Sequence, residues 1–194
     1  FSWLQVTQGT QSFVRKIELS PNFSNDNTVF ASTTGGGVLR STNRGDSWEQ
    51  TNRGLPQVTV YDITLSPNYA NDVVMFVATS EGVFKSEDGA ASWNKSSAGI
   101  TARMINVIEV SPNFANDYTL FAGSTGEGLF KSIDDGSSWE RVEDSGLSSN
   151  FIWSLAISPG FATDKTMYTG ARGQGLFKST DDGNTWTVPI QNIE

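Results

Sequence analysis

The chain has 194 residues, 37% of them apolar, and a formal net charge of −8 at neutral pH. An acidic chain lacks the basic surface that nucleic-acid binding needs, so we expect no nucleic-acid partner. Cysteine and histidine are both absent, which excludes disulfides, thiolate nucleophiles, and imidazole metal ligands or general bases. We expect no metal site and no cofactor. No apolar run approaches the roughly 20 residues of a membrane helix, so we also expect no membrane span.

The chain repeats one order of strands and turns four times. Residues 2–7 read like residues 47–51 at the end of the first unit, so we expect residues 1–9 to be the closing strand of a preceding unit. Each full unit opens with an alternating apolar run, as at 14–19, that ends in a Ser-Pro pair. Proline fixes φ and removes a ladder donor, so this pair ends the first strand.

The rest of each unit is read from its turn residues. After the Ser-Pro pair we expect a polar turn closed by Asn or Asp, such as Asn25-Asp26. In the first unit a second strand runs through 29–31, glycines 35–37 mark a hairpin, and a third strand covers 38–40. A fourth strand follows the next tryptophan. No helical periodicity of useful length is present, so an all-β fold is predicted.

An eight-residue stretch between the third and fourth strands returns in every unit, and its tryptophans are 45, 46 and 47 residues apart. Such spacing is typical of propeller blades and other repeat arrays. In the third unit Asp134 can accept hydrogen bonds from the turn, Gly136 can take a positive φ, and Trp139 can bury its ring beneath. We assign a structural role to these residues and their counterparts: Ser41, Asn43, Gly45 and Trp48; Ser86, Asp88 and Trp93; Ser132, Asp134, Gly136 and Trp139; Ser179, Asp181, Gly183 and Trp186.

The pattern Ser-x-Asp-x-Gly-x-x-Trp resembles the Asp-box, or BNR repeat, and the chain resembles the Asp-box β-propellers. That group includes sialidases, xyloglucan-active glycosidases, sortilin-type receptors and photosystem assembly factors. The resemblance implies four full blades of four antiparallel strands plus one extra N-terminal strand. Within a single domain, 1–194, we expect the blades to cover 10–54, 55–99, 100–146 and 147–194. In the second unit glycine comes early, at Gly89, and Ala90 stands where glycine belongs, so we expect a distorted turn.

Positions that vary between units near the start of the first strand are the best candidates for a binding surface. One column, aligned on the Ser-Pro pair, holds Arg15, Tyr61, Asn106 and Trp153. Residues just before this column add Phe13, Arg103, Met104 and Phe151. Aromatic and arginine side chains suit a binding rim. Packing between blades would also account for the larger side chains.

Carboxylates that break the repeat are the candidates for chemistry. Glu18, Asp62 and Glu109 lie on the first strand of their units, the strand that lines a propeller channel. Glycoside hydrolysis needs two carboxylates flanking one bond, but solvated channel groups are the simpler interpretation. Sialidases also need a cluster of arginines, whereas the arginines of this chain are scattered along the sequence.

We therefore expect a non-catalytic scaffold that binds a protein or carbohydrate ligand through one rim. The alternative is the propeller portion of a carbohydrate-active enzyme whose catalytic residues lie mostly outside this chain. The resemblance implies a bacterial protein with an extracellular or periplasmic location. An unpaired blade face would expose apolar surface, so we expect an excerpt of a longer propeller, or a homodimer or larger assembly that completes the ring.

Overall fold

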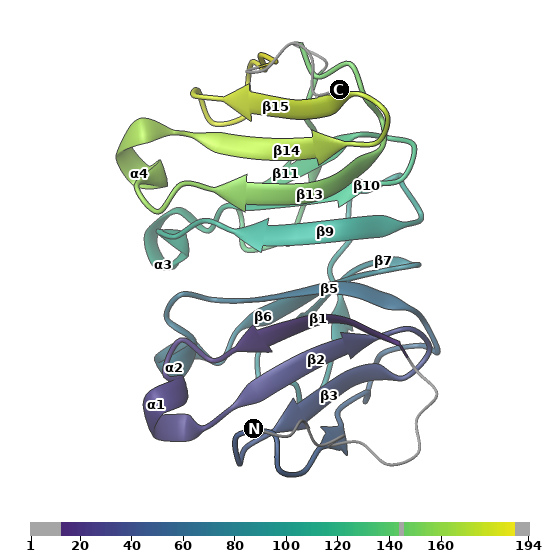
Figure 1. The fold of residues 1–194 in the computed structure, drawn as a ribbon, viewed down its shortest axis with the longest axis vertical. Coiled ribbons are helices and arrows are strands. Elements are labelled where there is room, and N and C mark those ends of the chain that lie inside the picture. Colours follow the sequence, from purple (N-terminus) through teal and green to yellow (C-terminus); the bar gives the residue numbers. More distant parts are fainter. Residues whose placement is uncertain (1–12, 144–145, 189–194) are drawn as a thin grey trace, which may run out of the picture.

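The computed structural model describes residues 13–143 and 146–188, which form four antiparallel sheets (Figure 1). We call these sheets blades 1 to 4 in chain order. Blade 1 contains β1 (Val14–Leu19), β2 (Val29–Thr33), β3 (Gly37–Ser41) and β4 (Glu49–Gln50). Blade 2 contains β5 (Val60–Leu65), β6 (Met75–Thr79), β7 (Gly82–Ser86) and β8 (Asn94–Lys95). Blade 3 contains β9 (Ile105–Val110), β10 (Leu120–Ser124), β11 (Leu129–Ser132) and β12 (Glu140–Arg141). Blade 4 contains β13 (Ile152–Ile157), β14 (Met167–Ala171) and β15 (Gly175–Ser179).

Strands that are consecutive in sequence pair within every blade, so each blade is an antiparallel meander. This confirms the predicted all-β fold built from propeller-type blades. In the described part of blade 4, an isolated bridge between Lys178 and Thr187 stands where a fourth strand was expected. The closing strand predicted at residues 1–9 lies outside the described residues. Across the described chain, no helix is long and apolar enough to cross a membrane.

The turn after each Ser-Pro pair is a single turn of helix, where the sequence predicted a non-helical polar turn. These helices are α1 (Phe23–Asp26), α2 (Tyr69–Asp72), α3 (Phe114–Asp117) and α4 (Phe161–Asp164). Asp72 shows how the turn closes: its carboxylate accepts hydrogen bonds from Ser66 Oγ at 2.6 Å and from the Val74 amide at 3.0 Å. The leading aromatic ring is buried in α2, α3 and α4. Four residues are too few to show a helical period, which is why the sequence did not reveal them.

Successive blades pack face to face, because their first strands, β1, β5, β9 and β13, lie side by side in chain order (Figure 1). We call the face directed at the following blade the forward face. In blade 2, Phe76 and Val83 of the forward face share one apolar cluster with Ile108 of blade 3, and all three are fully buried. Burying a side chain of this size contributes about 1.5–3 kcal/mol relative to exposure. The interfaces between blades are therefore a main source of stability.

The eight-residue boxes form the outer turns and share one geometry. In blade 3, Ser132 Oγ donates to Asp134 Oδ1 at 2.8 Å and accepts from the Gly136 amide at 3.0 Å. Asp134 also accepts from the Ser138 amide at 2.8 Å and from Ser138 Oγ at 2.6 Å. These bonds lower the pKa of Asp134. One short carboxylate thus closes the turn on both its backbone and its side chains.

The box of blade 2 is not distorted, contrary to the expectation from its displaced glycine. The fourth and fifth box positions both have positive φ in every blade, with values of 67° at Gly89 and 71° at Ala90. In blade 3 the same two positions are Asp135 at 62° and Gly136 at 77°. Moving glycine by one position therefore changes which left-handed residue carries a Cβ atom, and leaves the turn unchanged.

The box tryptophans of blades 2 and 3 also link neighbouring blades, whereas the indoles of Trp48 and Trp186 donate within their own boxes, to the carbonyls of Gly45 and Gly183. Trp93 Nε1 donates to the Thr51 carbonyl of blade 1 at 2.7 Å, and Trp139 Nε1 donates to the Ser96 carbonyl of blade 2 at 2.9 Å. Both indoles are buried. Each of these two rings therefore packs beneath its own turn. Its N–H donates to the carbonyl of the residue that follows the last strand of the preceding blade.

Replacing the box aspartate tests its structural role. Asp134→Ala should lower the free energy of unfolding by about 1–2 kcal/mol, because three donors in the turn lose their acceptor. Asp134→Asn should lose less, since Asn43 accepts the equivalent bonds from Ser41 Oγ and the Ser47 amide in blade 1. Chemical denaturation of the three proteins measures both effects. Equal stability of wild type and Asp134→Ala would contradict the assignment.

Candidate functional site

The three carboxylates that break the repeat meet at one lysine on the first strands of blades 1, 2 and 3. Lys16 Nζ lies 3.0 Å from Asp62 Oδ1, 3.7 Å from Glu18 Oε2 and 3.8 Å from Glu109 Oε1. We call these four residues the inner-strand cluster. The sequence singled out the three acids but not Lys16, which occupies the same repeat position as Asp62. Opposite charges in one column of adjacent blades are the signal that could have identified the pair.

Asp62 is the hub of this cluster. It is buried, with 5% of its surface exposed. Its Oδ2 accepts from the Ile108 amide of blade 3 at 2.9 Å, and its Oδ1 accepts from the Ile63 amide at 2.9 Å. With the Lys16 ion pair, one carboxylate connects three blades. Both of its oxygens are occupied, which favours a structural role over proton transfer or nucleophilic attack at this carboxylate.

The surroundings of the cluster shift the acidity of its other members. Burial raises the pKa of Glu109 to about 7, and attraction to Lys16 offsets this only in part. Burial also raises the pKa of Glu18. For Lys16, burial opposes the charge, but attraction to Asp62 and Glu109 prevails and leaves its pKa raised. Glu109 is therefore the group that changes charge near neutral pH.

The pKa of Glu109 predicts a pH dependence of stability. The folded chain keeps this proton to about pH 7, whereas an unfolded chain releases it near the ordinary value of 4.5. The free energy of unfolding should therefore fall as pH rises between these values, by roughly 1–3 kcal/mol, and level off above them. Glu109→Gln should flatten this part of the profile. Denaturation of both proteins at several pH values measures the free energy of unfolding, and Glu140→Gln, at an exposed position, is the control. If the free energy of unfolding of Glu109→Gln fell with pH as steeply as that of the wild type, the assignment would be contradicted.

A β-bulge interrupts the first strand of every blade, and the variable column falls on it. Pairing shifts register between Val14 and Lys16 in blade 1, and at the equivalent point in the other three blades. The extra residues are Arg15, Tyr61, Asn106 and Trp153. A bulge residue stands outside the alternation of the strand and its side chain is re-aimed. This explains why the column varies while its neighbours repeat.

The bulge side chains differ in what they contact. The Arg15 guanidinium lies over the Tyr61 ring of the next blade, 5.4 Å from its centroid. Asn106 is buried and donates from Nδ2 to the Ile152 carbonyl of blade 4 at 2.8 Å. Trp153 is 48% exposed, with the Arg172 guanidinium 6.0 Å from its ring centroid. Asn106 thus joins blade 3 to blade 4, and we exclude it from the candidate binding surface.

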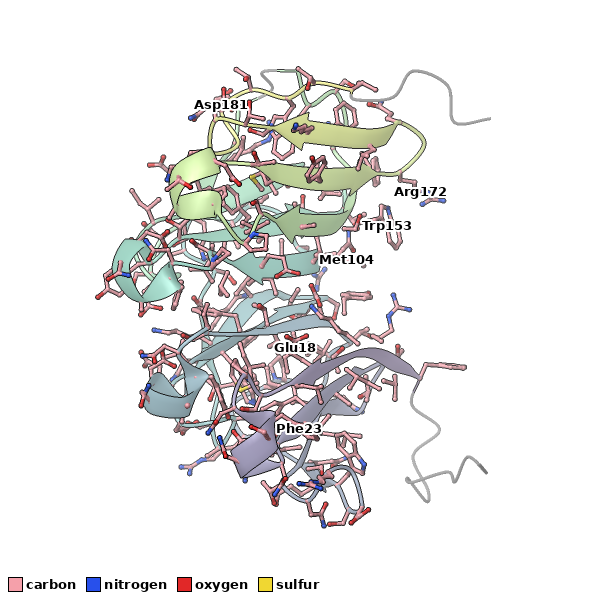
Figure 2. The ribbon with its side chains drawn as sticks, turned by 60° about the vertical axis from the view of Figure 1, so that its left-hand side comes forward. Glu18, Phe23, Met104, Trp153, Arg172 and Asp181 are labelled. Carbon is pink, nitrogen blue, oxygen red and sulfur yellow. The ribbon has the colours of Figure 1, made fainter. Side chains whose placement is uncertain are left out.

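The remaining candidates lie along the edge where the first strands begin. Figure 2 shows Met104, Trp153 and Arg172 on one edge of the molecule, whereas Phe23 and Asp181 lie on the opposite side. The helices and boxes therefore face away from this edge. Arg172 was missed by the sequence interpretation, although it stands where the other units have Thr34, Ser80 and Thr125. We define the rim surface as Phe13, Arg15, Tyr61, Arg103, Met104, Phe151, Trp153 and Arg172.

The rim surface combines exposed rings with guanidinium groups. Phe13 and Phe151 are exposed, as are Arg103 and Arg172. Aromatic and arginine side chains are the types most often found at the centres of interfaces. In the residues that the structure describes, no group of three or more acidic, cysteine or histidine residues could hold a metal ion.

Comparison with known proteins shows the fold. No protein-family model and no curated protein matches the sequence. An ancestral GH74 enzyme is similar over 97% of this chain, with a TM-score of 0.75 and 26% identity, and this chain covers 26% of that structure. The GH74 xyloglucanase from Xanthomonas campestris matches 98% of this chain, with a TM-score of 0.73, 19% identity and 32% of its own length covered.

A third similar structure is YCF48 from Cyanidioschyzon merolae, which matches 96% of this chain with a TM-score of 0.67 and 17% identity. The chain spans 59% of that structure. Another YCF48 structure contains a D1 peptide, and extracellular domains from B. thetaiotaomicron also match. These neighbours have propeller-like folds, and this chain spans less than two thirds of the length of each one.

Proposed function

We propose that the chain is a non-catalytic binding module that recognises a protein or a glycan through the rim surface. The observation that carries this proposal is the bulge at the same place in every blade. The bulge repeats the same backbone irregularity in every blade but carries four different side chains. Three of these side chains remain at least partly exposed. A rigid scaffold that presents varied aromatic and arginine side chains at one edge suits recognition.

The chemistry of the rim surface fits a ligand with flat apolar portions and hydrogen-bond acceptors. Exposed rings such as Phe151 and Trp153 offer stacking area, and Arg103 offers a planar donor group for carboxylates or hydroxyls. Two similar structures bear on the ligand class. YCF48 has been seen with a D1 peptide, and one GH74 neighbour is a xyloglucanase. Both kinds of ligand are elongated and suit a rim that crosses several blades.

We also propose a bacterial and extracytoplasmic setting. Extracellular domains from B. thetaiotaomicron share this fold over 94% or more of the chain.

One observation favours the alternative, the propeller portion of a carbohydrate-active enzyme. Glu109, with its pKa of about 7, could hold a proton near neutral pH as a general acid does. Against this, its neighbour Asp62 is committed to backbone amides of two blades. Turnover of fluorogenic glycosides by the chain, lost in Glu109→Gln while the fold is retained, would establish the enzyme and refute the non-catalytic proposal.

Binding at the rim surface can be tested with xyloglucan oligosaccharides and with an acidic peptide library. Phe151→Ala and Arg103→Ala should each weaken binding of the captured ligand about 5- to 30-fold, as losses of 1–2 kcal/mol at an interface centre do. Isothermal titration calorimetry gives the affinities. Ile133→Ala removes a more exposed apolar side chain, 69% against 41% for Phe151, from a box turn and should leave the affinities unchanged. Equal losses in all three variants, or no binding of either probe, would contradict the proposal.

A further inference from the structure

The hairpin between the second and third strands is one residue shorter in blade 2 than in blades 1 and 3. In blade 1 the Thr33 hydroxyl donates to a glycine carbonyl four residues along the chain, and blade 3 has the same spacing. In blade 2 the Thr79 hydroxyl donates to the Gly82 carbonyl, only three residues along. The short hairpin lies beside the start of β5, because the Ser80 amide donates to the Thr59 carbonyl at 3.1 Å. Blade 2 therefore has less polypeptide at the rim.

In blades 1 and 3, a polar side chain closes the space between this hairpin and the end of the blade. Asn52 Nδ2 donates to the Gly36 carbonyl at 2.8 Å. Arg141 Nε donates to the Glu127 carbonyl at 2.8 Å, and its Nη2 donates to Asn150 Oδ1 at 3.2 Å. Both hairpin carbonyls belong to the residue just before the glycine. The hairpin is thus held against the fourth strand or the linker that follows it.

Blade 2 has the same two positions but neither closing contact. Its counterpart of Asn52 is Ser97, whose hydroxyl lies 2.8 Å from the Val83 amide and 2.9 Å from the Val83 carbonyl, bonded to both. Its counterpart of Arg141 is Lys95, which pairs with the same position of the third strand. Among the residues that the structure describes, none forms a hydrogen bond or an ion pair with the Lys95 ammonium group. The space beneath the hairpin therefore stays open.

This space is a pocket of about 480 Å³, which we call the blade 2 pocket. Glu81, Lys95 and Ser97 border it on blade 2, and Thr101 and Arg103 border it on the linker to blade 3. The Arg103 guanidinium, like the Lys95 ammonium, is exposed and has no partner within the described part of the chain. The pocket thus presents two cations and one carboxylate that are available to a ligand.

The blade 2 pocket adjoins the exposed rings of the rim surface. Arg103 is followed by Met104, whose carbonyl accepts from the Thr125 amide at 3.0 Å. Thr125 in turn forms a β-bridge with Phe151. Neighbouring strands lie about 4.8 Å apart, so Phe151 lies roughly 10 Å from Met104. An elongated ligand anchored in the pocket therefore reaches this ring by crossing one blade.

The charges of the pocket discriminate between ligand types. Lys95 and Arg103 offer only donors, whereas Glu81 offers only acceptors. An acidic side chain of a peptide brings a carboxylate for the two cations but no donor for Glu81. A uronate sugar brings a carboxylate and several hydroxyl donors on one ring. Because hydrogen bonds to charged groups are stronger than neutral ones, a ligand that satisfies both kinds of charge is favoured.

We propose that the blade 2 pocket is a subsite for a uronate unit of an acidic glycan, an inference that rests on the proposed function of the rim surface and names its ligand class. The uronate carboxylate binds Lys95 and Arg103, and the sugar hydroxyls donate to Glu81. Adjoining sugar units extend to the ring of Phe151. The equivalent places in blades 1 and 3 do not accept such a unit, because hairpin contacts close them.

Calorimetric titration of the whole chain with tetrasaccharides of galacturonate and of mannuronate, and with their methyl esters, tests the subsite. The free acid of at least one sugar should bind at least about tenfold more tightly than its ester, because esterification removes the charge that Lys95 and Arg103 bind. Lys95→Gln should abolish this preference and leave the affinity for the ester unchanged. Ser97→Asn introduces the closing residue of blade 1 and should weaken binding of both forms at least about tenfold.

Two further variants are matched controls. Lys165→Gln also removes one positive charge, but from the end of α4, and should keep the preference for the free acid. Phe151→Ala should weaken binding of the acid and of the ester equally, because the ring does not contact the carboxylate. Thermal unfolding midpoints within a few degrees of wild type establish that the variants are folded.

Four results would each overturn the uronate subsite: equal affinity for acids and esters, an acid preference that survives in Lys95→Gln, tighter binding of a tetraglutamate peptide than of either uronate, and no binding of any saccharide. Failure of the rim function is a separate result, in which Phe151→Ala leaves the affinities for xyloglucan oligosaccharides and peptides unchanged. Loss of ester affinity in Phe151→Ala without an acid preference in the wild type refutes the subsite and keeps the rim function.

Discussion

A blade of this fold has two apolar faces and can bury neither of them alone, so every blade depends on its neighbours. Phe76 and Ile108 belong to different blades yet to one cluster. Because that burial is the dominant favourable contribution, other features act to hold neighbouring blades in register. The Trp139 indole donates to blade 2, Asp135 and Asp182 at the fourth box position pair with lysines of the preceding blade, and Asp62 binds an amide of blade 3. The Asp-box thus serves the interface between blades as well as its own turn.

The same constraint explains where variation is tolerated. Residues that alternate along a first strand must fit one blade face or the other, which fixes their size and polarity. The bulge residue belongs to neither face, so the chain can place Arg15, Tyr61 or Trp153 there without disturbing the interface. Asn106 shows the opposite use of the same position, since its amide binds blade 4. Binding capacity at the rim surface is therefore compatible with a rigid, repetitive framework.

Local features were predictable from the sequence because they depend on neighbouring residues. Strand alternation, glycine hairpins and the box spacing predicted the sheets. The single-turn helices were not predictable, since four residues show no period. The intact turn at Ala90 was missed because the sequence does not reveal that two adjacent positions share positive φ. The inner-strand cluster depends on the stagger between blades, which brings Lys16 to Asp62 across two strands far apart in sequence. Burial of Asn106 likewise depends on the position of the following blade.

The bulge releases the side chains of Arg15, Tyr61 and Trp153 from packing between blades, whereas Asn106 at the same position joins two of them, and the stability of alanine variants distinguishes the two cases. A variant with alanine at Arg15, Tyr61 and Trp153 should lose no more than about 2 kcal/mol of unfolding free energy, the size of the two exposed cation–π contacts that it removes. Asn106→Ala alone should lose about 1–2 kcal/mol, because a buried hydrogen bond between blades is broken. A loss of 3 kcal/mol or more in the triple variant, as expected for core truncation, would show that these side chains pack the blades and would contradict the account.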